Sequence, residues 1–215
     1  MRRWLLLFLG LGGCGVVLLA LCMHVAAQYA QPAEEKPFPC VVEGTPLRIV
    51  SLAGYDGPFW EDGSDREVVE VAALLVENQS SSCVEQGAVV IDWGEDRFVF
   101  EFTWLPPQSR TLVLESTAKR LCLPQDFRCY GWSRQRQLPQ SPVIAEVQNI
   151  TLRIMNPTGE VVPMVTVYYK HCYEGIYIGG ITYRASAQML EPGQWRILCP
   201  AHFSGQGSSI ICLKP

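Results

Sequence analysis

The sequence lacks the short patterns by which common hydrolases, redox enzymes and nucleic-acid-binding proteins are recognised. It has no G-x-S-x-G string, no C-x-x-C pair and no cluster of lysine and arginine. The first two absences remove the usual signatures of a serine hydrolase and of a thioredoxin-like redox site. The third, together with a net charge of −4, argues against nucleic acid as a partner.

Charged residues are absent from the long apolar segment between Arg3 and Glu34. Residues 4–27 are longer than the roughly 20 apolar residues that span the hydrocarbon core of a bilayer as a helix. Arg2 and Arg3 precede this run, so the rule that basic residues stay inside places the amino terminus in the cytoplasm. We therefore expect residues 1–27 to be a transmembrane anchor, which would be the chain's contact with the membrane, and the remainder to be extracytoplasmic.

A cleaved signal peptide is the alternative for the same segment. Val25, Ala26 and Ala27 supply the small residues that precede a cleavage site. Both alternatives export the rest of the chain.

Helical periodicity is scarce after residue 45, whereas strand patterns are frequent. The clearest is a hairpin of residues 88–93 and 97–104, in which Phe98, Phe100, Phe102 and Trp104 are expected to share one face. Further strands are predicted at residues 47–53, 67–77, 111–115, 146–155, 161–170 and 176–187, separated by Gly, Pro, Asn and Asp turns. These patterns predict an all-β fold.

The two halves of this region repeat one plan. Asn78-Gln79-Ser80 and Asn156-Pro157-Thr158 each end a strand, and the proline turns at residues 105–108 and 190–193 each precede a later one. We predict a spacer at 28–45 and two tandem small immunoglobulin-like β-sandwiches, at 46–138 and 139–215. One larger sandwich shared by both halves is the alternative.

Several of these segments also carry a resemblance to known proteins. The strings at residues 77–80, 100–107, 167–170 and 178–184 resemble those of uncharacterised bacterial envelope proteins with an amino-terminal membrane anchor. The architecture is similar to tandem extracellular modules of the FxLYD type, although no Phe-x-Leu-Tyr-Asp string occurs. The resemblance implies a place in the cell envelope and no particular functional residue.

Seven of the nine cysteines follow the apolar run, where an oxidising compartment would allow disulfides. The cysteines that we single out as candidates for pairing are Cys122, Cys129, Cys172, Cys199 and Cys212. Cys122 and Cys129 are expected to close a local loop, and a bridge is expected among the other three. The sequence leaves the connectivity open.

One enzyme-like alternative arises from the same cysteines. Cys199 and His202 form a C-x-x-H pair, and His171-Cys172 adds two further ligand types. These residues suit a zinc site, and hence a metal-dependent hydrolase in the second domain. Cysteines that lie outside the membrane favour disulfides instead.

We expect a non-catalytic binding or structural role in the envelope, with no catalytic, cofactor-binding or metal-binding residue. The partner would be another envelope protein or a glycan. Five tyrosines of the second half either line a binding surface or pack between sheets: Tyr168, Tyr169, Tyr173, Tyr177 and Tyr183.

Overall fold

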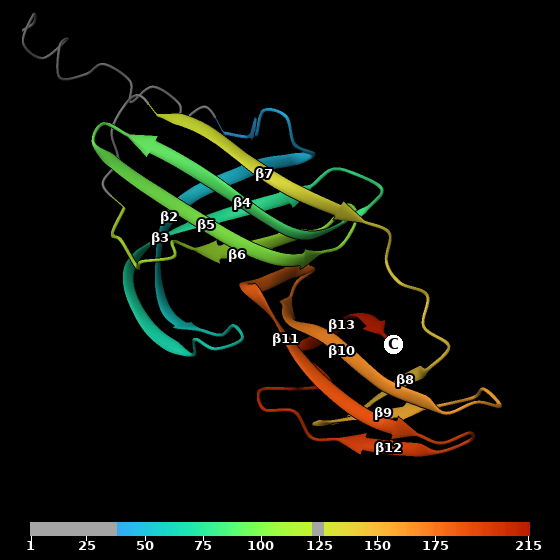
Figure 1. The fold of residues 1–215 in the computed structure, drawn as a ribbon. Helices are drawn as coiled ribbons and strands as arrows, with labels where there is room; N and C mark the ends of the chain where they lie inside the picture. Colours follow the sequence, from blue (N-terminus) through green and yellow to red (C-terminus); the bar gives the residue numbers. More distant parts are fainter. Residues whose placement is uncertain (1–37, 122–126) are drawn as a thin grey trace, which may run out of the picture. The chain divides into compact units, whose positions relative to one another are not determined.

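The structure is a computed structural model, and it describes residues 38–121 and 127–215. These residues form an all-β fold of thirteen strands, which Figure 1 labels, and no helix occurs among them. The strands are β1 (Cys40–Val41), β2 (Leu47–Phe59), β3 (Arg66–Asn78), β4 (Cys83–Trp93), β5 (Asp96–Leu105), β6 (Arg110–Leu114), β7 (Arg128–Arg136), β8 (Ile144–Gln148), β9 (Thr151–Met155), β10 (Val162–Tyr173), β11 (Ile176–Leu190), β12 (Trp195–Leu198) and β13 (Ser208–Lys214).

The predicted membrane segment at residues 1–27 lies outside the described residues. Within residues 38–121 and 127–215, no helix has the length and apolar character needed to cross a bilayer.

Each half of the chain contributes six strands in the same arrangement. In the first half β3 lies between β2 and β6, and β4 lies between β5 and β7. In the second half β9 lies between β8 and β12, and β10 lies between β11 and β13. Two three-stranded layers are therefore built twice, from strands in the same order along the chain (Figure 1).

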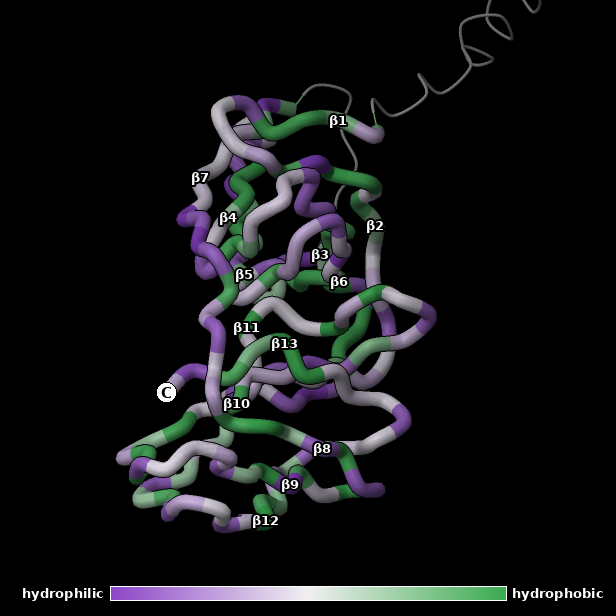
Figure 2. The backbone as a smooth tube through the Cα atoms, turned by 90° about the vertical axis from the view of Figure 1, so that its right-hand side faces the viewer, coloured by the Kyte–Doolittle hydropathy of each residue, from purple (hydrophilic) through white to green (hydrophobic). Residues whose placement is uncertain are grey.

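Two separate apolar cores follow from this arrangement. The first gathers inward residues from both layers of the first half, including Leu74 of β3 and Phe100 of β5. The second does the same in the second half, with Ile154 of β9 and Val167 of β10. Hydrophobic and hydrophilic residues alternate along the strands in Figure 2, as expected for strands with one buried face.

One sheet runs through both halves. Strands β6 and β11 pair in parallel, with Thr111 opposite Tyr177 and Leu112 opposite Ile178. This pairing joins two layers into a seven-stranded sheet of order β1-β2-β3-β6-β11-β10-β13. The division into domains at 46–138 and 139–215 stays a prediction, and the two predicted domains share this sheet.

The repeat seen in the sequence corresponds to a buried hydrogen-bond cluster around an asparagine, which occurs once in each half. The side-chain amide of Asn78 donates to the carbonyl oxygens of Leu105 and Ser82, at 3.1 and 2.8 Å. That of Asn156 donates to the carbonyl oxygens of Leu190 and Glu160, at 2.8 and 2.7 Å. Both asparagine side chains are fully buried. Each copy thus uses one buried amide to tie a strand end to the proline turn that the sequence places in the same position.

The serine or threonine two positions after each asparagine adds two hydrogen bonds to this cluster. Ser80 and Thr158 each donate a backbone N–H and a hydroxyl to the asparagine Oδ1, at distances of 2.7 to 3.0 Å. This is the local bonding that makes Asn-x-Ser and Asn-x-Thr favourable in turns.

Three details differ from the sequence predictions. Strand β2 continues through the Gly-rich residues 54–59, which were expected to form a loop, because it remains paired with β3 as far as Phe59. The strand expected at 146–155 is instead a hairpin of β8 and β9, which turns at Asn149 with φ of 50°. Trp104 has φ of 49° and leaves the face of Phe98, Phe100 and Phe102 to pack beside Cys83 and Cys212.

Replacing Asn156 by alanine should lower the free energy of unfolding by about 2 to 4 kcal/mol. The change removes the hydrogen bonds of a buried amide and leaves buried carbonyl groups without donors. Asn78→Ala should have a similar effect, and the exposed Gln148→Ala is the control. Urea denaturation followed by tryptophan fluorescence measures the change, and a loss below 0.5 kcal/mol would contradict the proposed stabilisation.

Candidate functional site

The most unusual polar site lies where β11 meets the first half. The β10–β11 ladder pairs Tyr169 with Tyr183 and then His171 with Ile178, so residues 179–182 of β11 are left out of it. The sequence predicted a bulge or bend at Gly179-Gly180, and this irregularity confirms it. A bulge leaves backbone N–H and C=O groups without ladder partners, and those groups need others when they are buried.

Lys170 bonds the carbonyl groups that the bulge leaves free. Its Nζ donates to the carbonyl oxygens of Gly179 and Gly180, both at 2.7 Å, and lies 3.5 Å from Oγ1 of Thr111. The Thr111 hydroxyl itself donates to the Gly179 carbonyl at 3.0 Å. The lysine side chain is almost completely buried, which is rare for lysine unless its charge is compensated.

Residues of the first half bond the other side of the bulge. Oε2 of Glu61 accepts from the N–H groups of Gly180 and Ile181, at 2.9 and 3.1 Å. Thr103 Oγ1 accepts from the N–H of Thr182 at 2.9 Å. The bulge is therefore held between Lys170 on β10 and side chains that come from the first half of the chain.

Glycine is required in this bulge because the two halves approach each other closely. A Cβ atom added at Gly179 would lie 2.7 Å from the carbonyl oxygen of Trp60, and Gly179 has φ of 97°. A Cβ atom at Gly180 would meet the carbonyl oxygen of Glu101 and Cγ1 of Val113. The Gly-Gly pair thus permits the contact that Lys170 and Glu61 stabilise.

Burial sets the protonation of this lysine. Desolvation lowers the pKa of Lys170 from 10.5 to about 7, and the nearby Glu61 carboxylate opposes the change. Lys170 is thus a lysine with a strongly lowered pKa, a property that is common at functional sites and also occurs in structural networks. Its donors are already directed at backbone carbonyls inside the protein.

A pocket of about 320 Å³ opens beside this junction. Tyr183 donates its hydroxyl to Oδ1 of Asp65 at 2.8 Å, and Nε2 of His202 lies 2.6 Å from Oδ2 of the same carboxylate. Tyr169 donates to the carbonyl oxygen of Ala201 at 2.9 Å. The pocket is lined by residues 62–65, 183–185 and 200–202 together with Tyr169.

Both tyrosines of this pocket remain neutral over the physiological range. Burial raises the pKa of Tyr169 to about 12, and the carboxylates of Asp62 and Asp65 add to the effect. Burial also raises the pKa of Tyr183, to which the hydrogen bond with Asp65 contributes. The hydroxyl groups are therefore hydrogen-bond donors, and neither is a nucleophilic phenolate at neutral pH.

A second hollow, of about 310 Å³, adjoins the first. Asp62 and Arg184 line both, and they form an ion pair at 3.8 Å on the protein surface. Trp104 and Tyr168 line the second hollow, with ring centroids 4.7 Å apart. Tyr183 packs in the second core and also lines a surface pocket. The binding role expected for the tyrosines stays a prediction.

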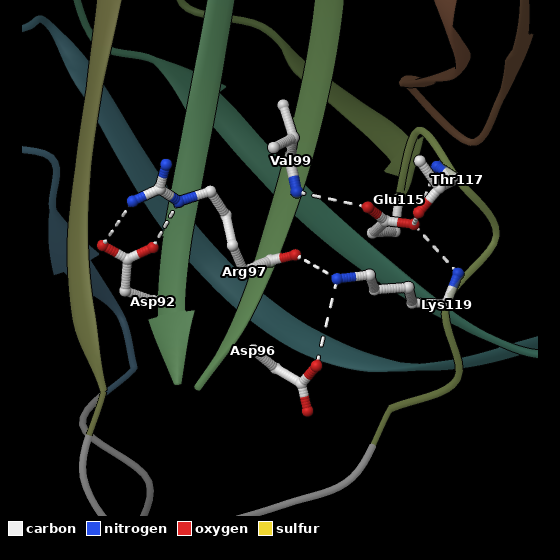
Figure 3. A network of polar contacts seen from close by, with 7 residues as sticks. All are labelled: Asp92, Asp96, Arg97, Val99, Glu115, Thr117 and Lys119. Atoms are coloured by element: carbon white, nitrogen blue, oxygen red, sulfur yellow. Dashed lines mark hydrogen bonds and ion pairs between the residues drawn. The ribbon is translucent and has the colours of Figure 1, made fainter. Parts of the chain in front are cut away.

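A different polar network, at the turn after β6, has a structural explanation. The buried Glu115 carboxylate accepts from the backbone N–H groups of Thr117 and Lys119 at 2.8 and 2.9 Å, and the Lys119 side chain reaches the Arg97 carbonyl (Figure 3). Arg97 pairs with Asp92 on the neighbouring strand at 2.7 Å. These contacts fix the turn after β6 against β5.

The residues of the zinc alternative have other surroundings. His202 contacts Asp65, while the His171 ring packs against Trp60 at a centroid distance of 5.6 Å. Burial lowers the pKa of His171, and its Nε2 is buried without a hydrogen-bond partner among the described atoms. Across residues 38–121 and 127–215, no three His, Cys, Asp or Glu side chains group in a way that could hold a metal.

No disulfide is formed among the cysteines that the structure describes. Cys129, Cys172, Cys199 and Cys212 are free thiols, as are Cys40 and Cys83. Cys122, the expected partner of Cys129, lies outside the described residues. The disulfide expected among Cys172, Cys199 and Cys212 stays a prediction.

Sequence reasoning did not identify Glu61, Thr103 and Thr111 as a group. They are far apart in the chain, and they meet where β11 contacts the first half. A usable signal existed for Lys170, a charged residue that follows the β-branched and aromatic segment 165–169 and precedes a Gly-Gly pair.

Comparison with known proteins adds no assignment to this geometry. No family model, curated protein or solved structure matches the chain.

The buried lysine predicts a pH dependence of stability. Between pH 7 and 10.5 the unfolded chain keeps the Lys170 proton that the folded chain releases, so the free energy of unfolding should rise with pH. Lys170→Met lacks this contribution. The stability of wild type relative to Lys170→Met should therefore increase across this range.

Urea denaturation at pH 7, 8 and 9 in the presence of a reductant measures this difference. Lys214→Met, which removes the same formal charge from the last strand, corrects for net charge. A wild-type advantage that is constant with pH, or that shrinks as pH rises, would contradict the lowered pKa.

Proposed function

We propose that this protein is a non-catalytic, extracytoplasmic β-protein of the cell envelope, tethered to the membrane through residues 1–27. Its role would be to bind another envelope protein or a glycan. The two six-stranded units would be immunoglobulin-like β-sandwiches of the kind found in anchored bacterial envelope proteins. The apolar run after Arg2 and Arg3 supports the location.

One observation carries the non-catalytic part of the proposal. The polar groups with the strongest catalytic potential are engaged in holding the protein together. Lys170 directs its Nζ at two backbone carbonyls, and Glu61 Oε2 accepts two backbone N–H groups. Since Lys170 is nearly inaccessible, a substrate would have to open the junction to reach it.

The surface around Arg184 is the best-supported place for a partner. Asp62 and Arg184 lie at the rims of two adjoining hollows, and the Arg184 side chain is about 72 % exposed. Tyr183, His202 and Trp104 give these hollows aromatic walls beside charged groups. Aromatic residues and arginine are enriched in recognition surfaces, because they offer large contact areas together with polar atoms.

The proposed location predicts how Cys199 reacts in intact cells. Cys199 is exposed, so a membrane-impermeant maleimide should label it in the full chain without lysis. Labelling should fall sharply in Cys199→Ser. If labelling requires lysis or a membrane-permeant reagent, Cys199 faces the cytoplasm and the proposal is wrong.

The proposed binding surface predicts a position-specific cross-link. A photoreactive benzophenone residue placed at Arg184 should give a discrete protein adduct in cells, because it probes both hollows. The control position is the exposed Glu160 in the turn between β9 and β10. Equal adducts at both positions would indicate random collision and would contradict the assignment.

A glycan partner would give a different result. Purified wild-type chain should then co-sediment with insoluble envelope polysaccharide, and Arg184→Glu should lose most of this binding. If neither the protein adduct nor the polysaccharide binding is found, the binding role is contradicted.

A further inference from the structure

We propose that two disulfides form in this chain in an oxidising compartment, between Cys40 and Cys129 and between Cys83 and Cys212. These pairs differ from those that the sequence suggested. Their partners are farther apart along the chain. The inference rests on the extracytoplasmic location proposed above, and it adds covalent links both within the first half and between the halves.

The segment that contains β1 runs beside the inner face of β7, with contacts at two matched positions. Phe38 stacks on Phe127 with ring centroids 5.5 Å apart. Four residues further along both segments, Val42 contacts Gly131. A Cβ atom added at Gly131 would lie 3.0 Å from Cγ1 of Val42. Cys40 and Cys129 are the middle positions of the same two segments.

Strand alternation directs both cysteines toward each other. Side chains two positions apart on an extended segment lie on the same face, so Cys40 shares the face of Val42. Cys129 likewise shares the face of Phe127 and Gly131. Both cysteines pack against the first core, and each is partly buried. The contacts on either side thus bring the two thiols opposite one another.

The second pair lies at the junction of the two halves. Cys83 of β4 and Cys212 of β13 belong to one small buried cluster, together with Trp104 and Ile211. Tyr168 lies opposite Cys212 on the neighbouring strand, and its ring packs against that of Trp104. Cys83 is fully buried and Cys212 nearly so, which places both thiols inside this cluster.

The pKa values of the thiols agree with a short distance within each cysteine pair. They also indicate when the bonds would form. Burial raises the pKa of Cys129 to about 12, with Cys40 as the second cause. Burial likewise raises the pKa of Cys83 to about 12, and Cys212 is again the second cause. Buried thiols with raised pKa values react slowly, so oxidation would occur before folding is complete.

The oxidant would be the disulfide of an oxidising protein or of a small thiol compound. One cysteine thiolate attacks a sulfur of that disulfide and releases the other sulfur as a thiolate. The second cysteine then attacks the mixed disulfide and releases the oxidant's remaining sulfur. Two protons leave the cysteines, and the oxidant gains two electrons and becomes two thiols.

Disulfide mapping of the purified full chain tests the pairing. The reduced chain is unfolded in urea, refolded in detergent with reduced and oxidised glutathione, alkylated, and digested without reduction for mass spectrometry. We expect linked peptides containing Cys40 with Cys129 and Cys83 with Cys212. Cys129→Ser should lose only the first and Cys83→Ser only the second, whereas the exposed Cys199→Ser should keep both.

Predominant linkage of Cys122 to Cys129, or of Cys199 to Cys212, would overturn the proposal, and so would full alkylation of all four cysteines. Acid quenching and alkylation of intact cells provides the second measurement. Bonds that form after refolding but are absent in cells would place the chain in a reducing compartment. The pairing would then stand, and the location would be wrong.

Discussion

The demand that buried backbone groups find hydrogen-bond partners determines how the two halves of this protein meet. Residues 179–182 of β11 leave the ladder with β10, which frees carbonyl and N–H groups at a place closed to water. Lys170 satisfies the carbonyls from one side, and Glu61 satisfies the N–H groups from the other. Because Glu61 comes from the first half, the second half cannot complete this bulge alone.

The repeated strand arrangement and the irregular junction have different roles in the fold. Each copy closes its core with a buried asparagine, at Asn78 and at Asn156, bonded to the leucine carbonyl at the later proline turn. The copies differ where they touch: the β4–β5 ladder keeps its register, while the corresponding β10–β11 ladder contains the bulge. The repeated parts stabilise each unit, and the irregular part joins the units through β6 and β11.

The sequence predicts the local elements well because alternation and turn chemistry are local properties. It identifies the all-β class, the repeated Asn-x-Ser/Thr turns and the irregularity at Gly179-Gly180. It does not predict the β6–β11 pairing, since nothing in the pattern of either strand specifies a parallel neighbour 60 or more residues away. The positive φ of Trp104, which turns its ring out of the first core, also depends on tertiary contacts. The site around Lys170 depends on the β6–β11 pairing, which brings Thr111 to the bulge.

Amide hydrogen exchange of the folded chain, measured by NMR, tests the junction most directly. If Glu61 holds the bulge as described, the N–H groups of Gly180 and Ile181 should be protected nearly as well as that of Val167 in the second core, although they lie outside the ladder. The hairpin residue Gly175 supplies the unprotected reference. Exchange at Gly180 and Ile181 as fast as at Gly175 would contradict the account.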